Sequence, residues 1–360
     1  MAKGRKKPSL TGAVSAELRK DFNLSNFKAK KLLNSNVKHK EQTWIPLSPA
    51  FQEITSIPGI PMGHITLLRG HSDTGKTTAL IEAAVASQKM GVLPVFIITE
   101  MKWNWNHAIQ MGFKVEEEVD KETGEIINYD GFFLYADRGN LNSIEDVAAF
   151  INDLLDEQNR GNLPYDLLFL WDSIGSIPCD MSLKSKNNNN EWNAGAMSTQ
   201  FGNNVNQKVL LSRKESSPYT NTLVCINKVW TQKATSPMGQ PKLMNKGGMS
   251  MWFDSTFVIT FGNIMNSGTS KIKAIKDGKQ VEFAKRANIQ IDKNHINGIT
   301  TRGRIIMTPH GFIEDDDKAV KHYKNDHSSE WVAILGGMDF EIVEENDQME
   351  ETNPFAQEPD

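Results

Sequence analysis

An octapeptide at residues 70–77 constrains the fold of this 360-residue chain more than any other feature. It reads GHSDTGKT and matches the pattern Gly-x-x-x-x-Gly-Lys-Ser/Thr at every fixed position. The apolar run HITLLRG (64–70) precedes it, and a helix-like pattern follows at 76–90. A strand, a glycine-bounded turn and a helix in this order direct backbone N–H groups at a bound phosphate. The sequence therefore predicts a nucleoside triphosphate site.

Individual residues of this turn have distinct expected roles. Lys76 is expected to reach the β- and γ-phosphates, and Thr77 is expected to bind Mg²⁺. The remaining predicted nucleotide-binding residues of the turn and helix start are Gly70, His71, Ser72, Asp73, Thr74, Gly75 and Thr78.

Two acidic residues end other buried strands. Asp172 lies at the end of DLLFLWDS (166–173) and is expected on the Mg²⁺ side of the nucleotide. Glu100 ends LPVFIITE (93–100) and is expected to polarise the attacking water. The strand ends of a wound sheet meet at its carboxyl edge, which is where ligands bind. Alone, an acid at the position of Asp172 is often only a polar strand end, and Glu100 would also fit as a helix N-cap.

The pattern along the chain alternates strands with helices. This alternation predicts an α/β fold with a mainly parallel, twisted sheet and helices on both faces. Further strands are expected at 131–137, 221–227, 255–262 and 287–293, and further helices at 143–159 and 194–214. A hairpin is expected at 121–131, and polar loops are expected at 182–193 and 231–248.

Charge is distributed unevenly between the two ends of the chain. Residues 1–40 carry 11 Lys and Arg against two acids, whereas residues 339–360 carry nine acids and no Lys or Arg. This asymmetry indicates a polyanionic partner, contact between the ends, or two solvated ends. Only two cysteines are present, and no apolar run reaches the ~18 residues of a membrane helix. These features predict a cytoplasmic protein, in the host cytoplasm if it comes from a phage, with no membrane partner.

Several segments together resemble the RecA-type recombinases, including the phage UvsX and bacterial RecA types. SPAFQEITSIPGIPMGHITLLRGHSDTGKTTALIEAAV resembles the opening of their core. VFIITEM resembles the strand that ends in their catalytic glutamate, and LLFLWDSIGSI resembles the strand of their Mg²⁺ aspartate. LVCINKVW resembles their γ-phosphate-sensing strand, NKGGMSMWFDSTFVITF the end of their second DNA loop, and IQIDKNH their interface lysine strand. The matches follow the family order over about 46–315.

The resemblance implies a RecA-like ATPase core and an ATP-dependent recombinase with Mg²⁺ as cofactor. Such a protein polymerises on single-stranded DNA, pairs it with a homologous duplex, exchanges strands and hydrolyses ATP when DNA is bound. Its partners are DNA, further copies of itself in a helical filament, and single-strand-binding or mediator proteins. The implied organisation is a basic N-terminal segment for protomer contact (1–45), the core (46–315), a short extension (316–338) and an acidic tail (339–360).

The chain departs from the family at two positions. The γ-phosphate sensor of the family is a glutamine after asparagine, but here Asn227 is followed by Lys228, which would contact phosphate as a point charge. The strand that crosses the subunit interface keeps Lys293 but has His295 at its second lysine position. The resemblance also places His107 where the family stacks an aromatic ring on adenine, although a plain surface histidine fits that position equally well.

The resemblance places two DNA-binding loops at about 181–195 and 230–248. Cations and aromatic rings are interleaved in both, as in single-strand binders, although a polar loop with lysines is also typical of a solvated surface. The candidate DNA-binding residues are Lys184, Lys186, Trp192, Trp230, Lys233, Lys242, Lys246, Gly247 and Gly248.

Two other functions fit the same fold. A ring DNA helicase usually carries an N-terminal collar, whereas only about 45 residues precede the core here, and no arginine-finger strand is evident. An ATP-switched assembly protein without strand exchange has no need of long basic loops. The recombinase is therefore the leading hypothesis.

Overall fold

The structure is a computed structural model that describes most of the chain. The described residues are 38–185, 190–232, 242–245, 249–264, 270–276, 279–330 and 341–343, with Asn23 and Asn26. By contacts the chain divides into residues 1–40 with 214–216, and residues 41–213 with 217–360. In the first unit, Lys38 Nζ lies 2.6 Å from Glu215 Oε1. The second unit contains the sheet and all features discussed below.

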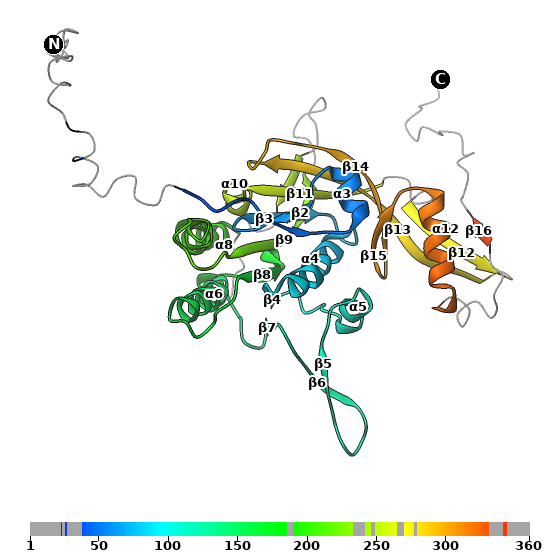
Figure 1. The fold of residues 1–360 in the computed structure, drawn as a ribbon, viewed down its shortest axis with the longest axis horizontal. Helices are drawn as coiled ribbons and strands as arrows, with labels where there is room; N and C mark the ends of the chain where they lie inside the picture. The colour runs from blue at the N-terminus through cyan, green and yellow to red at the C-terminus, as the bar shows by residue number, and fades with distance from the viewer. Residues whose placement is uncertain are drawn as a thin grey trace, which may run out of the picture. The chain divides into compact units, whose positions relative to one another are not determined.

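Parallel strands form the centre of a large mixed sheet, so the predicted α/β fold with a mainly parallel central sheet is confirmed (Figure 1). The strand order across this part is β11-β3-β9-β8-β4-β7. Their bounds are β3 Ile65–Gly70, β4 Leu93–Ile98, β7 Leu134–Asp137, β8 Leu167–Asp172, β9 Thr222–Gln232 and β11 Phe257–Asn263. Most of these residues are buried, as expected for strands covered on both faces.

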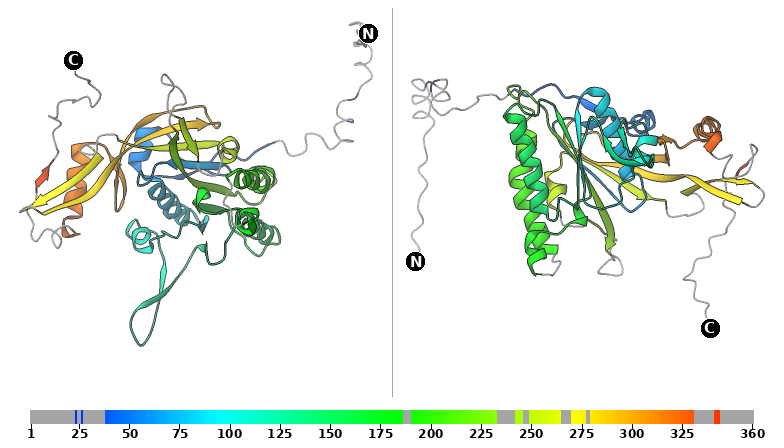
Figure 2. Two further views of the ribbon diagram at one scale, coloured as in Figure 1. Left: turned by 180° about the vertical axis from the view of Figure 1, so that it is seen from behind. Right: turned by 90° about the horizontal axis from the view of Figure 1, so that it is seen from below.

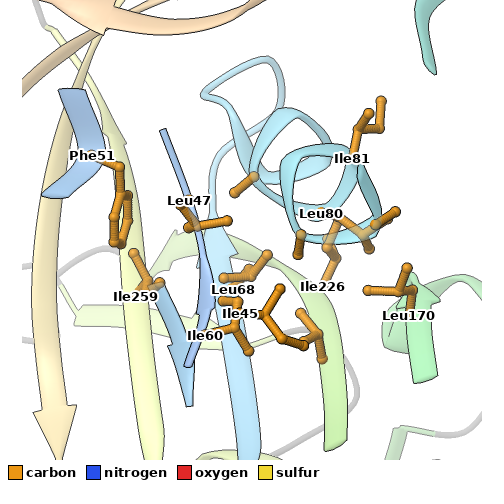
Figure 3. Packing of buried hydrophobic residues seen from close by; sticks show 14 of the residues in the cluster. Ile45, Leu47, Phe51, Ile60, Leu68, Leu80, Ile81, Leu170, Ile226 and Ile259 are labelled. Carbon is orange, nitrogen blue, oxygen red and sulfur yellow. The ribbon is translucent and has the colours of Figure 1, made fainter. Parts of the chain in front are cut away.

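Side chains alternate between two hydrophobic cores, one on each face of the sheet. On one face, Leu68, Leu170 and Ile226 pack with Leu80 of helix α4 (Lys76–Met90), as Figure 3 shows. On the other face, Trp171 stacks on Phe201 with ring centroids 4.9 Å apart. Helix α6 (Ile144–Asn159) covers that second face together with α8 (Asn190–Met197), the π-helical segment η2 (Ser198–Val205) and α9 (Asn206–Leu211). Both views in Figure 2 show helices on the two faces.

Antiparallel strands extend the sheet beyond β11. Strand β13 (Lys279–Asn294) pairs with β11 through one half and with β12 (Lys271–Lys276) through the other. Strands β14 (Arg302–Thr308) and β15 (Gly311–Glu314) follow. A third core forms where helix α12 (Asp317–Asp326) packs on this extension, with Tyr323 stacked on Phe283. The strand predicted at 287–293 is therefore only the second half of a 16-residue strand.

The predicted polar loops contain regular structure. Helix α7 (Asp180–Ser185) and the start of α8 occupy most of the loop expected at 182–193, so this prediction is wrong for its described residues. At the second loop, β9 continues to Gln232 and pairs with β10 (Lys242–Asn245) as an antiparallel hairpin. The hairpin predicted at 121–131 is present as β5 (Glu116–Val119) and β6 (Ile126–Asp130), and it reaches away from the sheet in Figure 1.

The remaining elements are short. They are β1 Trp44–Pro46, α3 Pro49–Thr55, β2 Gly59–Pro61, α5 Trp105–Gln110, η1 Ile174–Ser176, α10 Ser250–Asp254 and β16 Glu341–Val343. Among the helices that the structure describes, none has the length and apolar character to cross a bilayer.

Candidate nucleotide site

The turn between β3 and α4 is built on glycine. Helix α4 begins at Lys76, and the preceding Gly75 has φ +105°, a conformation that favours glycine. A Cβ on Gly75 would lie 2.7 Å from Met307 Sδ and 2.9 Å from Phe312 Cε1. The second glycine of the sequence pattern is therefore required both by the backbone and by the close approach of β14 and β15.

Lys76 lies inside the turn. Its side chain is buried, and its ammonium donates a hydrogen bond to the backbone carbonyl of His71. Burial lowers the pKa of Lys76 from 10.5 to about 8, and the nearby Asp172 carboxylate opposes this change. A buried ammonium in a glycine-bounded turn at the start of a helix is typical of an anion-binding position.

Asp172 and Thr77 meet across the sheet edge. The Thr77 hydroxyl donates to Asp172 Oδ2 at 3.0 Å. Burial raises the pKa of Asp172 to about 6, although the hydrogen bond from Thr77 opposes the rise. A buried carboxylate beside a hydroxyl supplies the oxygen ligands that Mg²⁺ prefers. The structure thus brings together the two residues predicted to bind the metal.

Glu100 is held at the same edge by three side chains. It forms an ion pair with Lys228, lies 3.2 Å from Lys102 Nζ, and accepts a hydrogen bond from Ser173 Oγ at 3.1 Å. Its backbone N–H donates to the Asp172 carbonyl at 3.2 Å. Burial alone would raise the pKa of Glu100, but the hydrogen bonds and charge of Lys228 and Lys102 outweigh burial, so the net pKa is lowered.

Sheet register explains why these residues meet. Strand β9 lies between β3 and β8, and its Lys228 is the register partner of Gly70, the first glycine of the turn. Strand β4 lies on the far side of β8, where Ile98 is the register partner of Asp172. Residues far apart in sequence therefore converge because their strands are parallel and end at one edge.

A cleft of 340 Å³ opens beside the turn. Asp73 to Thr78 line one side, and Met307 with four residues of β13 line the other. Sequence reasoning did not predict the four β13 residues, which are Glu282, Phe283, Ala284 and Lys285. The signal that points to them is the Asp-Gly pair at 277–278, a hairpin signature that places 279–286 beside 271–276.

Three other residues were predicted to contact the nucleotide or to act on it. Asn227 is buried on β9, and no partner for its Oδ1 occurs among the described residues. His107 is half-buried on α5, and the described lining of the cleft does not include it. Lys293 donates to the backbone carbonyls of Trp252 at 3.0 Å and Phe253 at 2.9 Å, near the end of α10. Its partners in this single chain are thus helix carbonyls.

The candidate DNA residues divide by their exposure. Trp230 is 51% exposed on β9, and Lys184 is exposed on α7. Trp192 is half-buried and packs against the core beneath α8, so its ring is only partly available. Lys186, Lys233, Lys246, Gly247 and Gly248 lie outside the described residues, as does the side chain of Lys242.

Comparison with known proteins adds no assignment. A scan against protein-family models gives no match, and a search of curated proteins gives none. The residues that meet at the sheet edge therefore carry the functional argument.

Proposed function

We propose that this chain is an ATP-dependent DNA recombinase with a RecA-like core. It would polymerise on single-stranded DNA, promote pairing and strand exchange with a homologous duplex, and hydrolyse ATP in response to DNA. This is the activity that its resemblance to RecA-type recombinases implies. The sheet-edge geometry supports the ATPase part directly, and the DNA part rests on the resemblance and on the position of Trp230.

The convergence of Lys76, Thr77, Asp172 and Glu100 carries the proposal. An ammonium, a hydroxyl and two carboxylates meet at one end of adjacent parallel strands, next to a phosphate-binding turn. General binding of an anion requires only the turn and the ammonium. The second carboxylate is superfluous for binding, and it is the kind of group that positions and deprotonates water. The set therefore favours hydrolysis over simple nucleotide binding.

The charges of the site fit ATP with Mg²⁺. The Lys76 ammonium and the Asp172 carboxylate are both buried. Burial lowers the pKa of Lys76 and raises the pKa of Asp172, so it favours the neutral form of each group. Phosphate oxygens beside Lys76 would restore a partner for its charge, and a cation held by Thr77 and Asp172 would do the same for the carboxylate. Bound Mg²⁺ would supply charge neutralisation at the phosphates. Lys76 would orient the phosphates, and Glu100 would hold the water.

Strand β9 links the two parts of the proposal. Lys228, beside Glu100, and the exposed Trp230 lie two residues apart on this strand. Alternate residues of a strand point to the same side. A base stacked on Trp230 would therefore lie near the residue that holds Glu100, and this arrangement gives DNA a short route to the hydrolytic carboxylate.

Steady-state ATP hydrolysis tests the proposal, measured with single-stranded DNA, with duplex DNA and without DNA, followed by negative-stain imaging of the same samples. We expect strong stimulation by single strands and helical filaments. Lys76→Ala should abolish hydrolysis, while Lys89→Ala, at the exposed end of the same helix, should leave it unchanged. Stimulation with closed rings would instead indicate a helicase. Hydrolysis that ignores DNA, with no DNA binding, would indicate an ATP-switched assembly protein.

A further inference from the structure

A second cluster of ligand-type side chains lies outside the nucleotide site. His310 follows β14 in the turn to β15, His327 caps the end of α12, and Glu330 lies one turn further on. His310 Nε2 lies 3.1 Å from Glu330 Oε1, and His327 Nδ1 lies 3.2 Å from the same oxygen. All three ligand atoms lie within 4.8 Å of one another, and all three residues are half-buried.

The two distances to the carboxylate oxygen are close to the spacing of neighbouring ligands around a tetrahedral metal. Zinc bonds to histidine nitrogen and carboxylate oxygen are about 2.0–2.2 Å long, so neighbouring ligand atoms lie about 3.4 Å apart. The carboxylate oxygen is therefore close to the required distance from both imidazole nitrogens. The two rings are stacked, with centroids 3.6 Å apart. The lone pairs of the stacked rings lie in nearly parallel planes, so binding of one ion by both would require side-chain rotations that splay the rings.

Neighbouring side chains orient the cluster. The Tyr323 hydroxyl lies 2.9 Å from His310 Nδ1, the ring nitrogen that faces away from Glu330. With a metal on Nε2, the His310 proton would reside on Nδ1 and donate to the tyrosine oxygen, as outer partners of metal-bound histidines commonly accept. The Gln110 amide nitrogen, Nε2, lies 3.3 Å from His310 Nε2 and 3.4 Å from Glu330 Oε2. Rotation of this amide offers its oxygen as a fourth ligand.

We propose that Gln110, His310, His327 and Glu330 form a binding site for a zinc-like divalent cation. Two imidazoles and a carboxylate select Zn²⁺ or Co²⁺ over Mg²⁺, which prefers oxygen ligands and keeps its waters. The site is thus chemically different from the Thr77–Asp172 pair. Its ligands come from α5, the β14–β15 turn and the end of α12, so a bound ion cross-links segments about 200 residues apart in sequence. This proposal does not depend on the recombinase assignment.

Metal titration of the chelator-stripped, nucleotide-free full chain tests the site. We expect one Zn²⁺ per chain to bind at this cluster, and Co²⁺ to give the intense visible absorption of four-coordinate geometry. His327→Ala and Glu330→Gln should each weaken Zn²⁺ binding at least ten-fold and remove that absorption. His322→Ala is the matched control: this residue lies on α12, its side chain is 80% exposed, and it pairs with Asp326 instead. Binding by this variant should equal that of the unmodified chain.

Thermal unfolding provides a second measurement. Saturating Zn²⁺ should raise the unfolding temperature of the unmodified chain and of His322→Ala, but not that of His327→Ala. Glu330→Gln keeps the size of the original side chain but removes its negative charge, so it separates loss of the anionic ligand from loss of folding. If zinc binds at Asp172 instead, its affinity should be unchanged by these substitutions. Zinc affinity that is unchanged in both His327→Ala and Glu330→Gln, or absence of stoichiometric binding, would overturn the proposal.

Discussion

Lys228 and Glu100 form an ion pair across the end of β8, although 128 residues separate them in sequence. Lys228 belongs to β9 and Glu100 follows β4, so the pair spans the strand that carries Asp172. By the resemblance to RecA-type proteins, this lysine stands where that family has a glutamine. In this structure its partner is the candidate hydrolytic carboxylate. The proposed phosphate sensor and the proposed catalytic group therefore act on one another directly.

Lys228→Met should raise the pKa of Glu100. The substitution removes the hydrogen bond and the positive charge that offset burial, so the carboxylate becomes easier to protonate. The acidic limb of the pH–rate profile for ATP hydrolysis should move to higher pH. Lys102→Met is the matched control, because Lys102 also contacts Glu100 but its side chain is 75% exposed and water screens its charge. An equal displacement in both variants would contradict the special role of Lys228.

Asp172→Asn should stabilise the nucleotide-free protein at neutral and alkaline pH. The folded chain holds the proton of Asp172 up to about pH 6, against an ordinary value of 3.8, so stability from this group is lost as the pH rises through that window. The full change in the pKa of Asp172 corresponds to about 3 kcal/mol of unfolding free energy, since a shift of one pKa unit is worth about 1.4 kcal/mol.

Urea unfolding at pH 4 and pH 8 measures this effect. The stabilisation by Asp172→Asn should appear at pH 8 and nearly vanish at pH 4, while Mg²⁺-dependent hydrolysis is lost. Asp73→Asn, an exposed change in the same turn, is the control and should not stabilise the protein at pH 8. The φ of +55° at Asp73 suits asparagine, so the control introduces no backbone strain.

Gly75→Ala should lower the free energy of unfolding of the whole protein as well as disturb the turn of the nucleotide site. Its Cβ would overlap Met307 and Phe312, and alanine is strained at φ +105°. Together these effects cost about 2–5 kcal/mol. Gly91→Ala, at φ +73° with open space around it, isolates the backbone effect and should cost about 1–2 kcal/mol. Denaturant midpoints of the two variants measure the contrast, and equal midpoints would show that the contact with β14 and β15 is unimportant.

Substitution of two tryptophans, one exposed and one packed against the core, should distinguish an effect on DNA binding from an effect on stability. Trp230→Ala removes an exposed ring and should weaken single-stranded DNA binding by about 1–3 kcal/mol with little effect on stability. Trp192→Ala removes a ring packed against the core and should lower the free energy of unfolding. Fluorescence anisotropy with labelled oligonucleotides and thermal unfolding of the same samples make the comparison. Unchanged DNA affinity in Trp230→Ala would remove that residue from the proposed DNA surface.

The parallel part of the fold was predictable because its sequence signals are local. Apolar runs ending in Glu100 and Asp172 mark the buried strands, and the helix predicted at 76–90 is observed with those bounds. The Thr77–Asp172 contact also follows, since parallel strands bring their ends to one edge.

Features that depend on pairing partners were not predictable from local pattern. The first half of β13 is rich in charged residues, and it is a strand because β12 pairs with it. The segment 182–193 has a polar composition typical of a loop. Its described residues are nevertheless helical, because α8 packs on α6. The Lys228–Glu100 pair required the strand order, because nothing in sequence shows that β9 and β4 flank β8.

Strand β9 has a mechanical consequence for a protein of the proposed kind. Two residues of extended chain span about 7 Å, so Lys228 and Trp230 lie close together on one regular strand. Strand β10 pairs with the outer part of this stretch, with Met244 opposite Trp230 and Asn245 opposite Val229, while Lys228 is paired with Gly70 of β3. In the proposed function, both residues would therefore move together as parts of one strand. Communication between nucleotide and nucleic acid would require no relayed rearrangement through the core.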